Sequence, residues 1–286
     1  MNFTKMQGLG NDFIVLADFD ALPADVSEQA VRLCDRHFGI GADGLVFLLP
    51  SSQADYMMRI INSDGTEPEQ CGNAIRCAAT YLYESGLVDA SVREITIETI
   101  GAGVQSVQLE LDNGRVDRVR VDMGEPVLQG LSIPTTLDAD SVVDQPISTG
   151  GQEFLFTAVS MGNPHCVIFV DDAVSLDVGV LGPPLEKHPF FPNKINVEFA
   201  TAHRRDFADM RVWERGAGPT LACGTGACAT LVAGVLTGRM DRRAIVALAG
   251  GELMIEWSEA DNRVYMTGPA RQVFTGTLPQ TNFILK

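Results

Sequence analysis

The sequence predicts an α/β (α+β) fold with two pseudo-symmetric domains, each a strand-rich barrel around a central buried helix. The first observation behind this prediction is an internal repeat whose two copies lie 152 positions apart throughout. Chance matches would not share one spacing in three separate regions, so the chain is predicted to be a duplicated domain. The matching segments are Gln70–Ala74 with Ala222–Gly226, Gly10-Asn11 with Gly162-Asn163, and Met58-Arg59 with Met210-Arg211.

The other two observations are a helix without a polar face and the many short strand-like runs in both copies. The segment Ala227–Thr237 is apolar on all sides and rich in small residues. Such a helix is buried all round, and this one is too short to cross a bilayer. Short strands curled around one buried helix, twice over, give the predicted pair of barrels.

In the first copy, the helical period predicts helices over Val26–Phe38 and Ala74–Tyr83, the second ending near Gly86. Val31 and Phe38 are expected on the apolar face of the first helix. Asn113-Gly114 is a strong hairpin signal. Alternating or apolar runs predict strands at Phe13–Ala17, Leu45–Leu49, Tyr56–Ile61, Glu94–Glu98, Gln105–Leu111 and Val116–Met123.

The second copy repeats this order, with the helix Ala227–Thr237 closed by Gly238. Its predicted strands are Phe154–Ser160, Cys166–Val170, Asn196–Ala200, Met210–Trp213, Ile245–Leu248, Leu253–Trp257 and Val264–Met266. The stretch 128–152 lacks periodicity and is interpreted as a linker plus a leading strand. We expect residues 1–122 plus 270–286 to form the first domain and residues 123–269 the second.

Composition narrows the class of protein. The 286 residues carry a formal charge of −16, with a sequence pI of about 4.5. Nucleic-acid and anionic-membrane partners require clustered Lys and Arg, so neither is expected. The N-terminus shows no signal peptide and no apolar stretch reaches membrane-span length, which predicts a cytoplasmic protein with reduced thiols.

Cys71 and Cys223 occupy equivalent places at the start of a helix in the two copies. Unpaired N–H groups and the helix dipole there favour the thiolate and can also hold a carboxylate. Two equivalent thiols facing one site would suit a two-base proton transfer. The other four cysteines are interpreted as small buried hydrophobes: Cys34, Cys77, Cys166 and Cys228.

Several motifs along the chain match one family: GLGNDF, CDRHFGIGADG, MRIINSDG, QCGNAIRC, GNPHCV, NVEF, WERGAGPTLACGTGA and the closing GPA. Through these motifs the chain resembles the diaminopimelate epimerase family along nearly its whole length. The resemblance implies two barrel domains with an active site in the cleft, and epimerisation of LL-2,6-diaminopimelate to the meso form. It also implies that no cofactor and no metal take part, and that the protein is a homodimer.

The resemblance assigns roles residue by residue. Cys71 and Cys223 match the acid–base pair, His165 and Glu214 match residues that tune the thiols, and Phe274 lies at a dimer contact. The residues that match substrate-binding groups are Asn11, Asn62, Gly72, Asn73, Asn163, Asn196, Glu214, Arg215, Gly224 and Thr225.

Some positions depart from the family pattern, and other interpretations stay open. Gln70, Ala74 and Gly44 stand where Met, Gly and Gln are common, and Phe274 replaces a Tyr. A proline or hydroxyproline racemase of the same fold is the first alternative. A thiol redox protein is the second. A zinc protein using Cys71, Cys77, Cys223 and Cys228 fits poorly, because usual zinc knuckles space their cysteines by about two to four residues.

Overall fold

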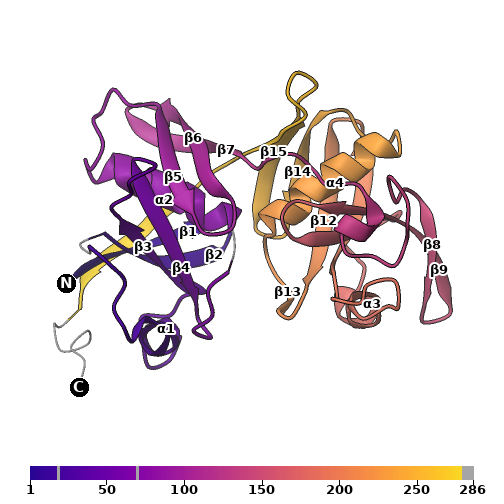
Figure 1. The fold of residues 1–286 in the computed structure, drawn as a ribbon, viewed down its shortest axis with the longest axis horizontal. Helices are drawn as coiled ribbons and strands as arrows, with labels where there is room; N and C mark the ends of the chain where they lie inside the picture. Colours follow the sequence, from indigo (N-terminus) through magenta and orange to yellow (C-terminus); the bar gives the residue numbers. More distant parts are fainter. Residues whose placement is uncertain (18–19, 69–70, 279–286) are drawn as a thin grey trace. The chain divides into compact units, whose positions relative to one another are not determined.

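The computed structural model describes residues 1–17, 20–68 and 71–278, and it divides into two compact units (Figure 1). Unit 1 comprises Met1–Val121 and Gly268–Lys286, and unit 2 comprises Asp122–Thr267. Among the described residues, no helix has both the length and the apolar character that a membrane crossing requires.

Unit 1 is a curled sheet around helix α2 (Gly72–Glu84), whose residues Ile75, Ala78 and Leu82 are buried. Neighbouring strands pair antiparallel except β2–β3 and β4–β5, which are parallel. Helix α2 packs against β1, β2, β3, β4, β6 and β17. The described strands follow in the order β17 (Arg271–Thr277), β1 (Asn2–Gly8), β2 (Asn11–Leu16), β3 (Gly44–Leu49), β4 (Tyr56–Asn62), β5 (Glu94–Thr99), β6 (Gly103–Asp112) and β7 (Arg115–Asp122).

Unit 2 has the same plan around helix α4 (Gly224–Leu236), which is buried over most of its length. Helix α4 packs against β9, β10, β11, β12, β14 and β15, and Figure 1 shows it beside the strands labelled β12, β14 and β15. A short strand, β13 (Gly218–Pro219), pairs with β12. The main strands follow in the order β8 (Gln145–Thr149), β9 (Gln152–Ser160), β10 (Pro164–Phe169), β11 (Asn196–Arg204), β12 (Phe207–Glu214), β14 (Arg243–Leu248), β15 (Gly251–Trp257) and β16 (Val264–Gly268).

The sequence repeat is a repeat of structure. Helices α2 and α4 begin and end 152 positions apart, and so do α1 (Val26–Cys34) and α3 (Val178–Glu186). The pairing of Phe13 with Gly44 in unit 1 is equivalent to the pairing of His165 with Asn196 in unit 2. The predicted fold, two strand-rich barrels around buried helices, is therefore confirmed.

The first helix is shorter than its apolar pattern predicts. It ends at Cys34 because the Asp35 carboxylate accepts hydrogen bonds from the backbone N–H of His37 and Phe38, both at 2.7 Å. Phe38 is 93% exposed and Val31 is 51% exposed, so placing either on a buried face was wrong.

Helix α3 and strands β1, β13 and β17 were not predicted from the sequence. Helix α3 contains Pro183 and Pro184, which argue against a helix in the sequence, yet Asp177 caps its start by accepting from the Gly179 N–H at 2.9 Å. Strands β1 and β17 pair with each other from opposite ends of the chain. The predicted hairpin turn is confirmed, since Asn113 and Gly114 both have positive φ, 48° and 79°.

Candidate active site

In unit 1, Cys71 is the N-cap residue of α2, with φ −148° and ψ 106°. Its sulfur lies 3.7 Å from Oδ1 of Asn11, at the start of β2. The same oxygen accepts a hydrogen bond from the Asn73 amide at 3.1 Å. Three predicted site residues therefore meet at one end of the buried helix.

A fully buried arginine supports this end of the helix. The Arg76 guanidinium donates to the Gly72 carbonyl at 3.0 Å and to Oδ1 of Asn73 at 2.8 Å. It thereby fixes the Asn73 amide so that its NH₂ group faces Asn11. Arg76 was not predicted as a site residue, and the equivalent position of unit 2 holds Cys228 instead of a cation.

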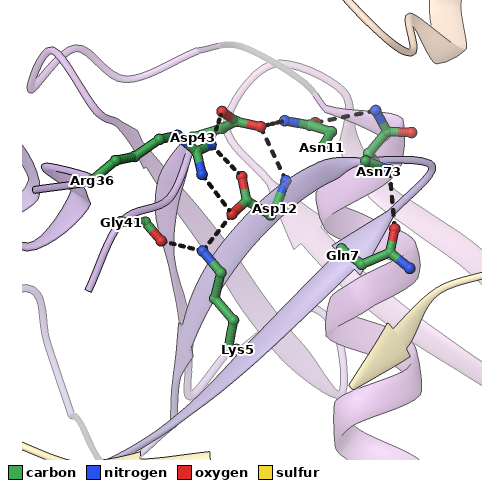
Figure 2. A network of polar contacts seen from close by, with 9 residues as sticks. Lys5, Gln7, Asn11, Asp12, Arg36, Gly41, Asp43 and Asn73 are labelled. Carbon is green, nitrogen blue, oxygen red and sulfur yellow. Dashed lines mark hydrogen bonds and ion pairs between the residues drawn. The ribbon is translucent and has the colours of Figure 1, made fainter. Parts of the chain in front are cut away.

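A charged network holds Asn11 from the other side (Figure 2). Asp43 accepts from the Asn11 amide at 2.6 Å and from the Asp12 N–H at 3.0 Å. Arg36 bridges Asp12 and Asp43 at 2.6 and 2.9 Å, and Lys5 lies 2.5 Å from Asp12. Because the Asn11 amide nitrogen is committed to Asp43, its oxygen must face Cys71 and Asn73.

This network predicts a pH-dependent stability. Burial raises the pKa of Asp12, but hydrogen bonds from Arg36 and Lys5 outweigh that effect and hold the pKa below its usual value of 3.8. Its contribution to the free energy of unfolding is therefore present above about pH 4 and lost as pH falls through the folded-state pKa. Asp12→Asn should lower the Tm at pH 7, and the difference from wild type should shrink below pH 4.

Thermal unfolding followed by circular dichroism from pH 7 to pH 3 measures this effect. Asp140→Asn, at an exposed aspartate, is the matched control and should leave the Tm unchanged. A difference for Asp12→Asn that stays constant across this range would contradict the argument.

In unit 2, Cys223 is the N-cap residue of α4 but is only 5% exposed. Its sulfur lies 3.6 Å from the Thr225 hydroxyl. Burial, followed by the charges of Glu214 and Glu198, raises the pKa of Cys223 well above its usual value, and the Thr225 and Gly226 hydrogen bonds only partly offset this. The expectation that the helix N-terminus lowers the pKa of both thiols is therefore wrong for Cys223, because desolvation dominates.

Behind Cys223 lies a chain of three polar side chains. Nδ1 of His165 lies 2.7 Å from Oε1 of Glu198, and Nε2 lies 3.0 Å from Oδ1 of Asn163. His165 and Glu198 have no exposed surface. His165 and Asn163 were predicted site residues, whereas Glu198 was missed, although its motif NVEF places a carboxylate inside an apolar strand.

Glu214, Arg215 and Asn196 meet where β12 ends. Burial, with a smaller effect of Glu198, raises the pKa of Glu214, whose carboxylate accepts from the Thr220 hydroxyl. Asn196 accepts from the Arg215 N–H at 2.8 Å and donates to the Pro164 carbonyl, also at 2.8 Å. Asn196 is thus committed to backbone groups and holds the loop that carries Arg215.

The remaining predicted positions belong to unit 1. Asn62 ends β4 and donates to the Thr66 hydroxyl at 3.1 Å. Phe274, on β17, is 45% exposed and meets Phe3 edge-on, with ring centroids 6.0 Å apart. A Cβ at Gly44 would lie 2.8 Å from the Ile61 carbonyl, so a larger residue here would require the backbone of this chain to shift. Gln70 lies outside the described residues.

The remaining thiols are interior groups. Cys34, Cys77, Cys166 and Cys228 are all buried, as predicted, and burial raises the pKa of Cys77 to about 12. Among the described residues, His165, Glu198 and Cys223 offer ligand atoms within 4.8 Å of one another and could hold a metal ion. Both ring nitrogens of His165 already face polar partners, however, which favours a hydrogen-bonded network.

Comparison with known proteins decides the family. Residues 3–129 and 157–273 match the family model described as diaminopimelate epimerase. The chain belongs to the diaminopimelate epimerase family. It is therefore an epimerase, an enzyme of the isomerase class.

Relatives named diaminopimelate epimerase match this chain almost from end to end. That of Desulfitobacterium hafniense is 55% identical over 281 residues, covering 97% of this chain and 98% of its own. That of Moorella thermoacetica is 54% identical over 280 residues, covering 98% and 99%.

The fold is shared more widely than the family. A solved structure of a probable proline racemase from Agrobacterium radiobacter gives a TM-score of 0.71, covering 97% of this chain and 92% of its own. Its sequence is only 18% identical, so this likeness concerns the fold alone. The racemase alternative is not favoured against relatives of the diaminopimelate epimerase family at 55% identity.

Proposed function

We propose that this enzyme converts LL-2,6-diaminopimelate to the meso form without a cofactor, by proton transfer between Cys71, Cys223 and the substrate α-carbon. The observation that carries the proposal is the equivalent position of the two cysteines, each the N-cap residue of the buried helix in its unit. The names of the relatives supply the substrate.

In the proposed reaction, one cysteine acts as a thiolate and removes the α-proton. The electron pair left on carbon is delocalised into the substrate α-carboxylate, and the other cysteine donates its S–H proton to the opposite face. The thiolate and thiol have then exchanged roles, so proton and charge both balance. We assign Cys223 as the thiol of the resting enzyme, since burial and two nearby carboxylates oppose its ionisation.

The helix starts are proposed to hold the reacting carboxylate. Backbone N–H groups at Gly72-Asn73 and Gly224-Thr225 are free of intrahelical partners, because the first turn of a helix leaves its N–H groups unpaired. Donors placed there bind an anion and stabilise the charge that grows on the carboxylate as the proton leaves.

The distal amino-acid head of diaminopimelate is proposed to bind the charged groups at the end of β12. Arg215 supplies a planar guanidinium for its carboxylate, and Glu214 supplies an acceptor for its ammonium group. Asn62, Asn163 and Asn196 are the other residues proposed to bind the substrate here. Asn196 contributes by holding Arg215 in place.

We further propose that the enzyme works in the cytoplasm as a homodimer and supplies lysine and peptidoglycan precursors. Phe274 would lie in the dimer contact. We also propose that residues 1–122 with 270–286 form the first domain of the enzyme and that residues 123–269 form the second.

The test is a proton NMR time course of LL-diaminopimelate with purified enzyme in D₂O. Two bases that exchange with solvent before each turnover should place deuterium at the product α-carbon well before the remaining substrate is labelled. Equal early labelling of substrate and product would indicate a single base. Absence of turnover would contradict the function itself.

A further inference from the structure

The two units hold their equivalent asparagines with different carboxylates. In unit 1, Asp43 accepts directly from the Asn11 amide at 2.6 Å. The position equivalent to Asp43 in unit 2 is Ile195, which is apolar and 1% exposed. Asn163 must therefore be held by another group, and the group that contacts it is His165.

Glu198 completes that contact from the far side of the histidine. It lies on β11 with no exposed surface, and its Oε1 is 2.7 Å from Nδ1 of His165. Its other oxygen, Oε2, is buried without a hydrogen-bond partner among the described residues. A buried carboxylate is costly unless it is paired, so its retention in an apolar strand points to a role at His165.

The two hydrogen bonds of His165 determine how the Asn163 amide is oriented. Asn163 presents its oxygen to Nε2 of His165, so Nε2 carries a hydrogen and donates it. The 2.7 Å contact between Nδ1 and Oε1 joins the other side of the ring to the Glu198 carboxylate. The pair therefore leaves the Asn163 NH₂ group turned away from His165 and available to another partner.

The unit 1 equivalents of these residues cannot form such a pair. Phe13 stands at the position of His165 and Val46 at the position of Glu198. The start of the helix differs in the same way: a Cβ at Gly226 would lie 2.7 Å from Oε1 of Glu198, whereas unit 1 has Ala74 at that place. Gly226 therefore leaves room for the Glu198 carboxylate, and unit 1, which lacks this carboxylate, has an alanine at the equivalent position.

We propose that Glu198 is a positioning residue of the Cys223 half of the active site, which orients the Asn163 amide toward substrate by fixing the ring and tautomer of His165. The inference rests on the proposed epimerase function. Glu198 acts through another side chain and does not touch the reacting carbon.

The test exchanges Glu198 for residues that keep or remove its hydrogen bond. Glu198→Gln retains a donor for Nδ1 of His165, so kcat/KM for LL-diaminopimelate should stay within about threefold of wild type. Glu198→Val installs the residue found in unit 1 and should lower kcat/KM by about 100-fold, as should His165→Phe. The double variant Glu198→Val with His165→Phe should be no worse than either single variant.

A second variant tests the space that the Glu198 carboxylate occupies. A Cβ at Gly226 would lie 2.7 Å from Oε1 of Glu198 and 3.2 Å from the Cys223 sulfur, so Gly226→Ala should lower kcat/KM through both contacts, while the matched Ala74→Gly should stay near wild type. If Glu198→Val does not fold, as judged by circular dichroism, His165→Phe carries the test, and full activity of His165→Phe would then overturn the positioning role.

The outcomes separate this inference from the proposed function. A wild-type enzyme without activity on LL-diaminopimelate would contradict the proposed function. With an active wild type, full activity of Glu198→Val would overturn the positioning role. So would a Glu198→Gln variant as inactive as Glu198→Val, or losses in the double variant that multiply.

Discussion

Cys71→Ala and Cys223→Ala should each abolish epimerisation of LL-diaminopimelate. Each thiol serves one face of the α-carbon in the proposed reaction, so neither can replace the other. Removing a positioned acid or base typically costs about 10²–10⁴-fold in rate, and epimerisation requires both. The measurement is the initial rate by circular dichroism or NMR in both directions of reaction.

Cys77→Ala and Cys228→Ala are the matched controls, because each changes a thiol within the same two helices. Both side chains are fully buried, so these variants should lose some stability but keep their activity. If Cys228→Ala were as inactive as Cys223→Ala, a redox or metal centre would be the better explanation.

Arg215→Met should lower kcat/KM for diaminopimelate by about 100-fold or more, since two charge-assisted hydrogen bonds contribute roughly 1.5–3 kcal/mol each. Methionine keeps most of the side-chain volume but not the guanidinium. Binding energy from the distal head is expected to favour the transition state at the remote α-carbon, so kcat should fall together with kcat/KM.

Substrates give the complementary measurement. Lysine lacks the distal carboxylate, and proline lacks the whole distal head, so wild-type enzyme should turn over both very poorly. Arg204→Met is the control, because Arg204 is an exposed arginine of the same unit that contacts its near neighbours Asp206 and Phe207. Comparable kcat/KM for proline and diaminopimelate in the wild type would contradict the assignment.

The repeat made much of the site predictable from sequence. It placed Cys71 and Cys223 at equivalent helix starts and related Asn11 to Asn163. Local signals, which depend on a few neighbouring residues, were a second source, and they correctly predicted the helix start at Cys223 and the turn at Asn113.

What could not be predicted depends on contacts between distant segments. Arg76 lies in a helix whose sequence does not show that an arginine there is fully buried. Glu198 gains its meaning only when β10 and β11 pair and bring it to His165. The protonation of Cys223 is set by how deeply the barrel buries it, which helix-terminus chemistry alone does not reveal.

The pairing of β1 with β17 has a consequence for biosynthesis. Strand β1 pairs along its length with Arg271–Thr277, which the ribosome adds after all of unit 2, and the N-terminal ammonium donates to the Leu278 carbonyl at 2.9 Å. Unit 2 is one continuous segment, Asp122–Thr267, and its strands all emerge before β17 does. Domains usually fold from the N-terminus onward during synthesis. In this chain, the edge of β1 that pairs with β17 stays unpaired until β17 has been made. Unit 2, although it is made later than most of unit 1, is therefore the first unit whose strands are all available for folding.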